Sequence, residues 1–189
     1  AGLATGRVRA VDPDAPAAVL DARMTRGIEG VERAIAGPHE AGATQLLAVE
    51  GEVARLLDEE RLPVLVGGDH SVPFGAIAAC AKKHGSIGVL HFDAHADLRE
   101  AFEGFTWSHA SIMFNVLKEL ETVSRLVPVG VRDYADDEDA LIRANPERVQ
   151  TFFDPDLRRQ IFDGESWTRI ARRIVAALPV GAQFTPLMT

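Results

Sequence analysis

The chain has 189 residues, of which 47% are hydrophobic and 25% are charged, and its formal net charge is −8. This length and balance fit one globular domain with a sizeable core and exclude an intrinsically disordered chain. An acidic chain is also a poor fit to the phosphate backbone of nucleic acids, which binds clustered Lys and Arg, so we expect no nucleic-acid partner.

The same sequence favours a cytoplasmic protein. No apolar run approaches the roughly 20 residues that a membrane-spanning helix needs, so we expect no membrane partner. The single cysteine, Cys80, cannot form an internal disulfide, which suits a reducing compartment. The first residues, "AGLATGRVRAVDPDAP", contain no apolar core of a signal peptide.

Helix and strand patterns alternate along the first half of the chain. Apolar residues at helical spacing predict a helix that ends near Glu60, and a short apolar run predicts a buried strand over 64–66. Ser71 and Pro73 predict the start of the next helix, which "KKHG" ends with cations and a glycine. A second buried strand is predicted over 87–92.

The alternation continues in the second half. A helical apolar stripe predicts a helix over 112–120, and the run 126–131 predicts a strand. Pro128 fits that strand only at a sheet edge or a bulge, because it cannot donate to the ladder. The remaining predicted elements are a helix over 136–145, a strand over 149–153 and a helix over 166–175.

Strands that alternate with helices predict a three-layer α/β/α fold with a mainly parallel sheet. We find no repeat and no long linker, so we expect one domain over 1–189. In such a sheet, ligands bind at the carboxyl ends of the strands. "GGDH" (67–70) and "DAHAD" (93–97) each follow a predicted strand, so we expect them to meet at this edge.

The spacing of Asp93, His95 and Asp97 is typical of metal ligands. On an extended strand their side chains share one face, but Asp93 and Asp97 would lie about 13 Å apart at roughly 3.3 Å per residue. One ion with bonds of about 2.0–2.2 Å cannot bridge that distance. Either the chain turns sharply after His95, or more than one ion is held. His70, after a different strand, is the natural additional ligand.

Together these residues predict a metal site. A lone His or Asp is usually a cap or a surface group, but a cluster at strand ends is rarely structural. We therefore predict four metal ligands: His70, Asp93, His95 and Asp97. Oxygen and nitrogen ligands without a thiolate favour Mn, Mg, Fe or Co over a structural zinc site.

Three other polar residues lie near the predicted ligands. Asp69 neighbours His70 and is expected to accept backbone N–H bonds. His91 could face the site, but we expect a supporting or packing role for it. His109 is either a residue that merely begins a helix, or a proton shuttle or substrate hydrogen-bond partner near the metals.

Four segments resemble motifs of the ureohydrolase family, which contains arginases, agmatinases and formimidoylglutamases. They are "GGDHS" (67–71), "DAHAD" (93–97), "SHAS" (108–111) and "VGVRD" (129–133). The resemblance implies an arginase-like α/β/α fold with two Mn²⁺ ions at the carboxyl edge of the sheet. It also implies that a hydroxide held between the ions attacks the carbon of a guanidinium or amidine group.

The resemblance assigns roles to individual residues. It implies that His70, Asp93 and Asp97 bind one ion, and that Asp93 and His95 bind the other, with Asp93 bridging. It implies a catalytic, substrate-side role for His109.

Arg99 is the expected substrate-binding residue. It stands where arginases place an Asn that reads the amino-acid end of the substrate, and "DLR" is closer to formimidoylglutamases. Arg99 either pairs with a substrate carboxylate or is a surface residue paired with Glu100 or Glu103.

The family's third motif, S-x-D-x-D-x-x-D-P, does not occur in these 189 residues. We therefore expect a partial arginase-like domain, incomplete at one or both ends. The favoured function is a manganese-dependent hydrolase of linear C–N bonds in small guanidino or formimino compounds, releasing urea or formamide. The alternatives are a truncated, inactive metal-binding remnant and, less favoured, a zinc deacetylase-like protein. A homo-oligomer is left open.

Overall fold

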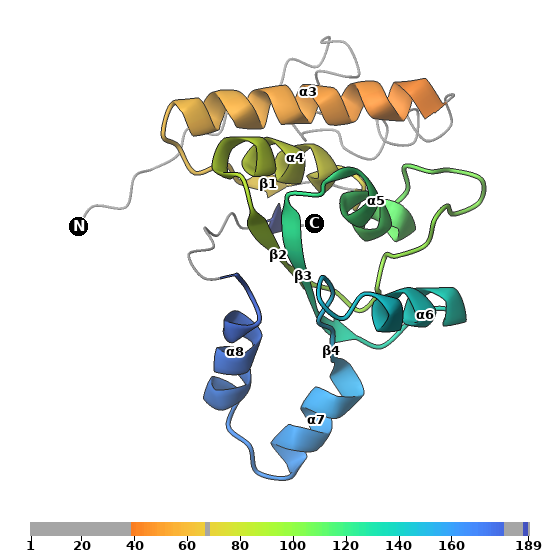
Figure 1. Ribbon diagram of the computed structural model, residues 1–189, viewed down its shortest axis with the longest axis vertical. Helices are drawn as coiled ribbons and strands as arrows, with labels where there is room; N and C mark the ends of the chain where they lie inside the picture. The colour runs from red at the N-terminus through yellow and green to blue at the C-terminus, as the bar shows by residue number, and fades with distance from the viewer. Residues whose placement is uncertain (1–38, 67–68, 180–186, 189) are drawn as a thin grey trace.

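A computed structural model describes residues 39–66, 69–179 and 187–188 (Figure 1). The helices are α3 (His39–Asp58), α4 (Pro73–His84), α5 (Ile112–Glu119), α6 (Asp136–Ala144), α7 (Asp154–Phe162) and α8 (Trp167–Ala176), with a 3₁₀ turn η1 (His109–Ser111). The strands are β1 (Leu65–Val66), β2 (Ile87–Phe92), β3 (Val123–Val131), β4 (Phe152–Phe153) and β5 (Leu187–Met188). None of these helices is long and apolar enough to cross a membrane. The predicted domain over 1–189 and the glycines of "GGDHS" extend outside the described residues.

The strands pair in parallel, as predicted, and form two sheets. β2, β3 and β4 pair in that order, and β1 pairs separately with β5. In the long β2–β3 pair, Val89 lies opposite Leu126 and Phe92 lies opposite Val129. Because both strands run in the same direction, their carboxyl ends reach the same edge, and the segments that follow them lie side by side there.

Helices cover both faces of the β2–β3–β4 sheet (Figure 1). On one face the core contains Ile77 of α4 and Val116 of α5, and α3 lies outside α4. On the other face Leu157 of α7 and Ile170 of α8 pack against Val127 of β3. These two apolar cores confirm the α/β class with helices on each side of the sheet.

The contact between α3 and α4 requires a glycine. A Cβ atom at Gly75 would lie 2.3 Å from the backbone oxygen of Leu46 in α3. No side chain tolerates that separation, so only glycine lets the two helix backbones approach this closely.

Pro128 lies within the central strand, and the hydrogen-bond pattern explains why it is tolerated. The Leu126 N–H donates to the Arg148 carbonyl, and the Leu126 carbonyl accepts from the Gln150 N–H. Backbone N–H and C=O groups of residues two apart on a strand point to the same side, so the Pro128 nitrogen faces the same neighbouring segment as Leu126 does. The β3–β4 register shifts between Val129 and Val131, so the missing N–H of Pro128 falls beside an irregularity of the ladder, which agrees with the expected edge or bulge.

Two elements, α7 and β5, were not predicted, and β3 begins three residues before the predicted strand. α7 has a helix-start signal, since Pro155 lies in its first turn with acidic residues beside it. Its apolar pattern is weak because only Leu157 is buried, whereas Phe162 is 90% exposed. Periodicity therefore fails to identify this helix.

Candidate metal centre

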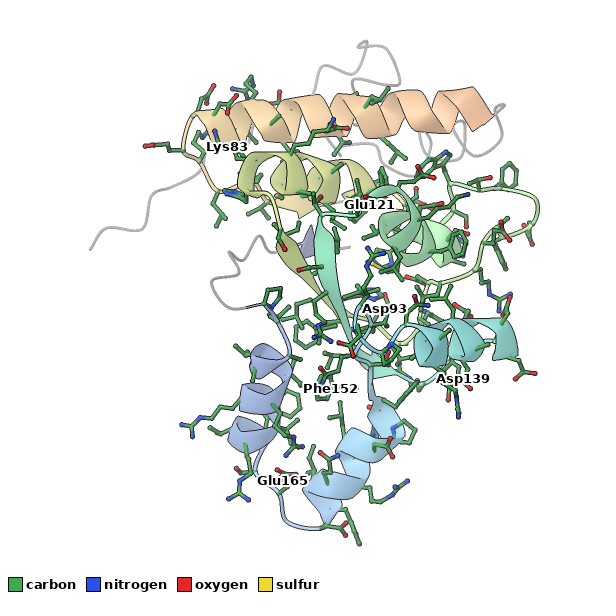
Figure 2. The ribbon with its side chains drawn as sticks, viewed as in Figure 1. Lys83, Asp93, Glu121, Asp139, Phe152 and Glu165 are labelled. Atoms are coloured by element: carbon green, nitrogen blue, oxygen red, sulfur yellow. The ribbon has the colours of Figure 1, made fainter. Side chains whose placement is uncertain are left out.

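The candidate site lies where the carboxyl ends of the strands meet. His70 follows β1, and Asp93 follows β2 directly. Figure 2 shows Asp93 between the ends of the central strands and α6. The segment after β2 is tied to its neighbour strand, since the Asp93 N–H donates to the Val129 carbonyl at 3.2 Å. His70 of the first motif and Asp93 and Asp97 of the second therefore lie together, as predicted.

Four side chains present possible metal-binding atoms to one point. They are His70, His91, Asp93 and Asp97, whose ligand atoms all lie within 4.8 Å of one another. His70 Nδ1 lies 2.6 Å from Asp97 Oδ2 and 3.6 Å from Asp93 Oδ2. Three of the four are predicted ligands, and His91 is the addition. The period of two along β2 placed His91 on the same face as Asp93, so the sequence did contain this signal.

A sharp turn brings Asp93 and Asp97 together. Asp97 has a φ of 55°, in the left-handed region that non-glycine residues rarely adopt. Its carbonyl accepts the N–H groups of Met113 and Phe114, at the start of α5, at 3.0 and 3.2 Å. The Ala94 carbonyl is held in the same way by two N–H groups that follow β3. The chain therefore turns after His95, which is one of the two predicted solutions to the ligand distance.

Glu138 anchors this turn from α6. Its side chain is 4% exposed, Oε1 accepts the Leu98 N–H at 2.9 Å, and Oε2 accepts the Ala135 N–H at 2.8 Å. The second bond is half of a capping box, in which an N3 Glu reaches back to the N-cap backbone. The first bond joins α6 to the residue after Asp97 across 40 positions of sequence. Sequence reasoning missed this role, because only the folded chain brings the two segments together.

The site shifts the pKa values of two of its members. Burial opposes ionisation of Asp93, but the neighbouring His91 ring, the His95 N–H and the His70 ring together hold its pKa well below the usual range. Burial also disfavours the charged form of His70, but the Asp97 hydrogen bond and the nearby carboxylates raise its pKa. The site thus favours a negative Asp93 carboxylate with a positive charge beside it, as a cation site requires.

His95 lies outside the group of four. Its side chain is 61% exposed, and its Nδ1 atom lies 3.1 Å from Asp93 Oδ1, while Nε2 is 3.9 Å from Asp133 Oδ2. Asp93 therefore presents Oδ2 toward His70 and Oδ1 toward His95.

Asp69 fulfils the structural role that was predicted for it. Its Oδ1 atom accepts the Ser71 N–H at 2.8 Å, and its carbonyl accepts the Val72 N–H at 3.3 Å. These bonds form the turn that leads from His70 into α4.

The predicted substrate residues form a second, more open group. The Arg99 guanidinium lies 5.6 Å from the Phe102 ring centre, and the His109 ring contacts Phe102 edge-on at 5.2 Å. Arg99 Nε is 3.6 Å from Glu138 Oε2, so the carboxylate beside Arg99 is Glu138 rather than the two predicted surface partners. His109 is 54% exposed, and its Nδ1 atom is 3.8 Å from Asp69 Oδ2.

Comparison with known proteins gives this geometry a family. Over 91 residues, the chain is 41% identical to the mitochondrial arginase of Medicago truncatula. The aligned segment makes up 47% of this chain and 27% of that protein. It is 41% identical over 63 residues to an agmatinase of Bacillus cereus, covering 33% of this chain and 22% of that protein. The matched segments thus span about a quarter of these relatives.

Structural similarity leads to the same family. The solved arginase structure from Medicago truncatula superposes with a TM-score of 0.59 at 30% identity, over 70% of this chain and 40% of that one. The family model described as "Arginase family" matches residues 19–176, which is most of the sequence. The chain therefore belongs to the arginase family.

Proposed function

We propose that the chain carries the metal-binding and substrate-facing part of a manganese-dependent hydrolase of linear C–N bonds in guanidino or formimino compounds. The products would be urea or formamide. The observation that carries the proposal is the convergence of His70, Asp93 and Asp97 at one strand edge in a chain of the arginase family.

The ligand types support a divalent cation. Two carboxylates and imidazole nitrogens are hard to borderline ligands, which suit Mn²⁺ and exclude a thiolate-type zinc site. Asp93 has one oxygen on the side of His70 and one on the side of His95, so it is the residue that would bridge two ions. When bound, such ions lower the pKa of water and so supply a hydroxide nucleophile near neutral pH.

The open group beside these ligands suits substrate binding. Arg99 is 41% exposed and carries the planar, paired donors that bind a carboxylate. His109 is exposed beside Arg99, since both side chains contact Phe102, and an imidazole ring can both donate and accept hydrogen bonds. We propose Arg99 as the residue that reads a substrate carboxylate and His109 as the residue that exchanges protons with the reacting group.

A second candidate is metal binding without catalysis. Two divalent ions bring four positive charges, whereas Asp93 and Asp97 bring two negative charges. The S-x-D-x-D-x-x-D-P motif, which would add acidic ligands, does not occur in the 189 residues. We propose that a cytoplasmic location accompanies either function.

A substrate panel tests the proposal. Mn²⁺-loaded protein is incubated with agmatine, arginine, guanidinobutyrate and formiminoglutamate, and the release of urea or formamide is measured. Arg99→Ala is expected to raise KM for substrates with a carboxylate by about 10–100-fold, and to leave KM for agmatine, which has none, nearly unchanged. Stoichiometric metal binding without turnover of any of the four would refute the hydrolase and favour the second candidate.

A further inference from the structure

His91 is a buried histidine without a hydrogen-bond partner. It lies on β2, two residues before Asp93, and its side chain is 4% exposed. Neither ring nitrogen has a hydrogen-bond partner among the residues that the structure describes. Buried polar atoms are almost always paired, because leaving them unpaired costs free energy. An unpaired imidazole in this position therefore calls for a partner of another kind.

The ring points at the candidate metal centre. His91 Nε2 lies 3.8 Å from Asp93 Oδ2 and 3.7 Å from Asp97 Oδ2, and the ring centres of His91 and His70 are 5.1 Å apart. These separations exceed hydrogen-bond length. They do match the spacing of two atoms that bind one ion, since bonds of about 2.0–2.2 Å place such atoms roughly 3–4.4 Å apart.

His91 and His95 differ in what they can reach. His91 faces the Oδ2 atoms of Asp93 and Asp97, on the side of His70, and it is buried. His95 is exposed and approaches the opposite oxygen of Asp93. Among the described residues, the His70 side of the site thus has four converging side chains. On the other side, the exposed His95 ring lies between Asp93 Oδ1 and the exposed Asp133 carboxylate.

We propose that His91 is a direct ligand, so that His70, His91, Asp93 and Asp97 together bind one divalent cation. This inference rests on the metal-binding part of the proposed function and adds a ligand to it. Two imidazoles and two carboxylates satisfy four coordination positions, and the two carboxylates balance the charge of one ion. The site would take a single Zn²⁺, Co²⁺ or Mn²⁺ ion without the side chain of His95.

X-ray absorption at the zinc edge tests the ligand set directly. The full chain is loaded with one equivalent of Zn²⁺, and the imidazole scattering is counted. We expect two imidazoles per ion in the wild-type protein. The same count is expected in His95→Phe, because that ring lies on the other side of Asp93.

Calorimetric titration gives the matching energetic test. His91→Phe keeps a buried ring of similar size, and exposed His84→Phe is the matched control. For a direct ligand, we expect His91→Phe to weaken the first equivalent of Zn²⁺ by more than the roughly 10–100-fold that loss of a supporting residue costs. His84→Phe is expected to stay within about threefold, as for a residue remote from the bound ion.

The outcomes separate this inference from the hydrolase proposal. One imidazole per ion, or a His91→Phe affinity within about 100-fold of the wild type, would overturn the inference and leave His91 as a supporting residue. No zinc binding at all would overturn it as well. If two imidazoles are counted and no substrate is turned over, the inference stands and the hydrolase proposal fails. If His91→Phe does not fold, the imidazole count in the wild-type protein still decides the matter.

Discussion

Removing the Glu138 side chain is expected to disturb the fold and the metal centre together. The carboxyl group is buried and accepts two backbone N–H groups, from Leu98 and Ala135. Each N–H left without its partner costs about 1–3 kcal/mol, so Glu138→Ala should lower the free energy of unfolding by about 2–5 kcal/mol. Glu138→Gln keeps one acceptor oxygen and should lose roughly half as much.

The coupling to the metal centre follows from the position of Leu98, directly after Asp97. Losing the Leu98 hydrogen bond releases the turn that holds Asp97 in its left-handed conformation. Glu138→Ala, which removes both acceptor oxygens, is therefore expected to weaken Mn²⁺ binding by about 10–100-fold, the usual cost of losing a residue that supports a ligand.

Urea unfolding and metal titration of the same variants provide the assay. Exposed Glu147→Ala is the matched control and should change the free energy of unfolding by no more than about 0.5 kcal/mol. The reasoning would be wrong if Glu138→Ala behaved like Glu147→Ala, or if Glu138→Ala lost stability while its Mn²⁺ affinity stayed at the wild-type value.

Three other predictions concern the scaffold and the metal-free site. Gly75→Ala should destabilise the protein by about 1–3 kcal/mol because its Cβ would strike the α3 backbone. Gly51→Ala, with open space around it, should stabilise the protein by about 0.5–1 kcal/mol. A thermal melt that ranks the two variants in the opposite order contradicts the helix packing. Arg148→Met should lower the free energy of unfolding by about 2–4 kcal/mol, because three carbonyls around the end of α5 and the start of β3 lose their donor. An unchanged midpoint of urea unfolding would show that these hydrogen bonds contribute nothing. In chelator-treated protein, protonated His70 stabilises the fold because its pKa is raised in the folded state. This stabilisation is fully present below the unfolded-state pKa of about 6.5 and is lost as the pH rises through the higher folded-state pKa. The prediction fails if His70→Asn loses stability over the same pH interval as steeply as the wild-type protein.

The sequence alone predicted the parts of the site that depend on the order and spacing of neighbouring residues. The apolar run of β2 followed by Asp93 predicted a strand end with ligands, and the distance between Asp93 and Asp97 predicted either a turn or a second ion, of which the structure contains the turn. Both inferences use only the spacing along a strand and the reach of a metal bond.

The missing parts depend on contacts between distant segments. Glu138 looks like an ordinary helix-start residue until α6 lies beside the turn after Asp97. His91 was predicted to support or pack, because nothing in the sequence shows that a buried histidine will lack a hydrogen-bond partner. α7 was missed because its exposed Ile161 and Phe162 break the apolar pattern that identifies an amphipathic helix.

Titration of Mn²⁺ into the metal-free chain, compared with Asp93→Asn, tests the proposed metal centre most directly. Asp93 is the one predicted ligand that faces both His70 and His95, and asparagine keeps its size and its acceptor for the His95 N–H. We predict saturable binding by the wild-type protein and an affinity at least about 100-fold lower in the folded Asp93→Asn variant. Equal affinities in the two proteins would contradict a metal centre at this strand edge.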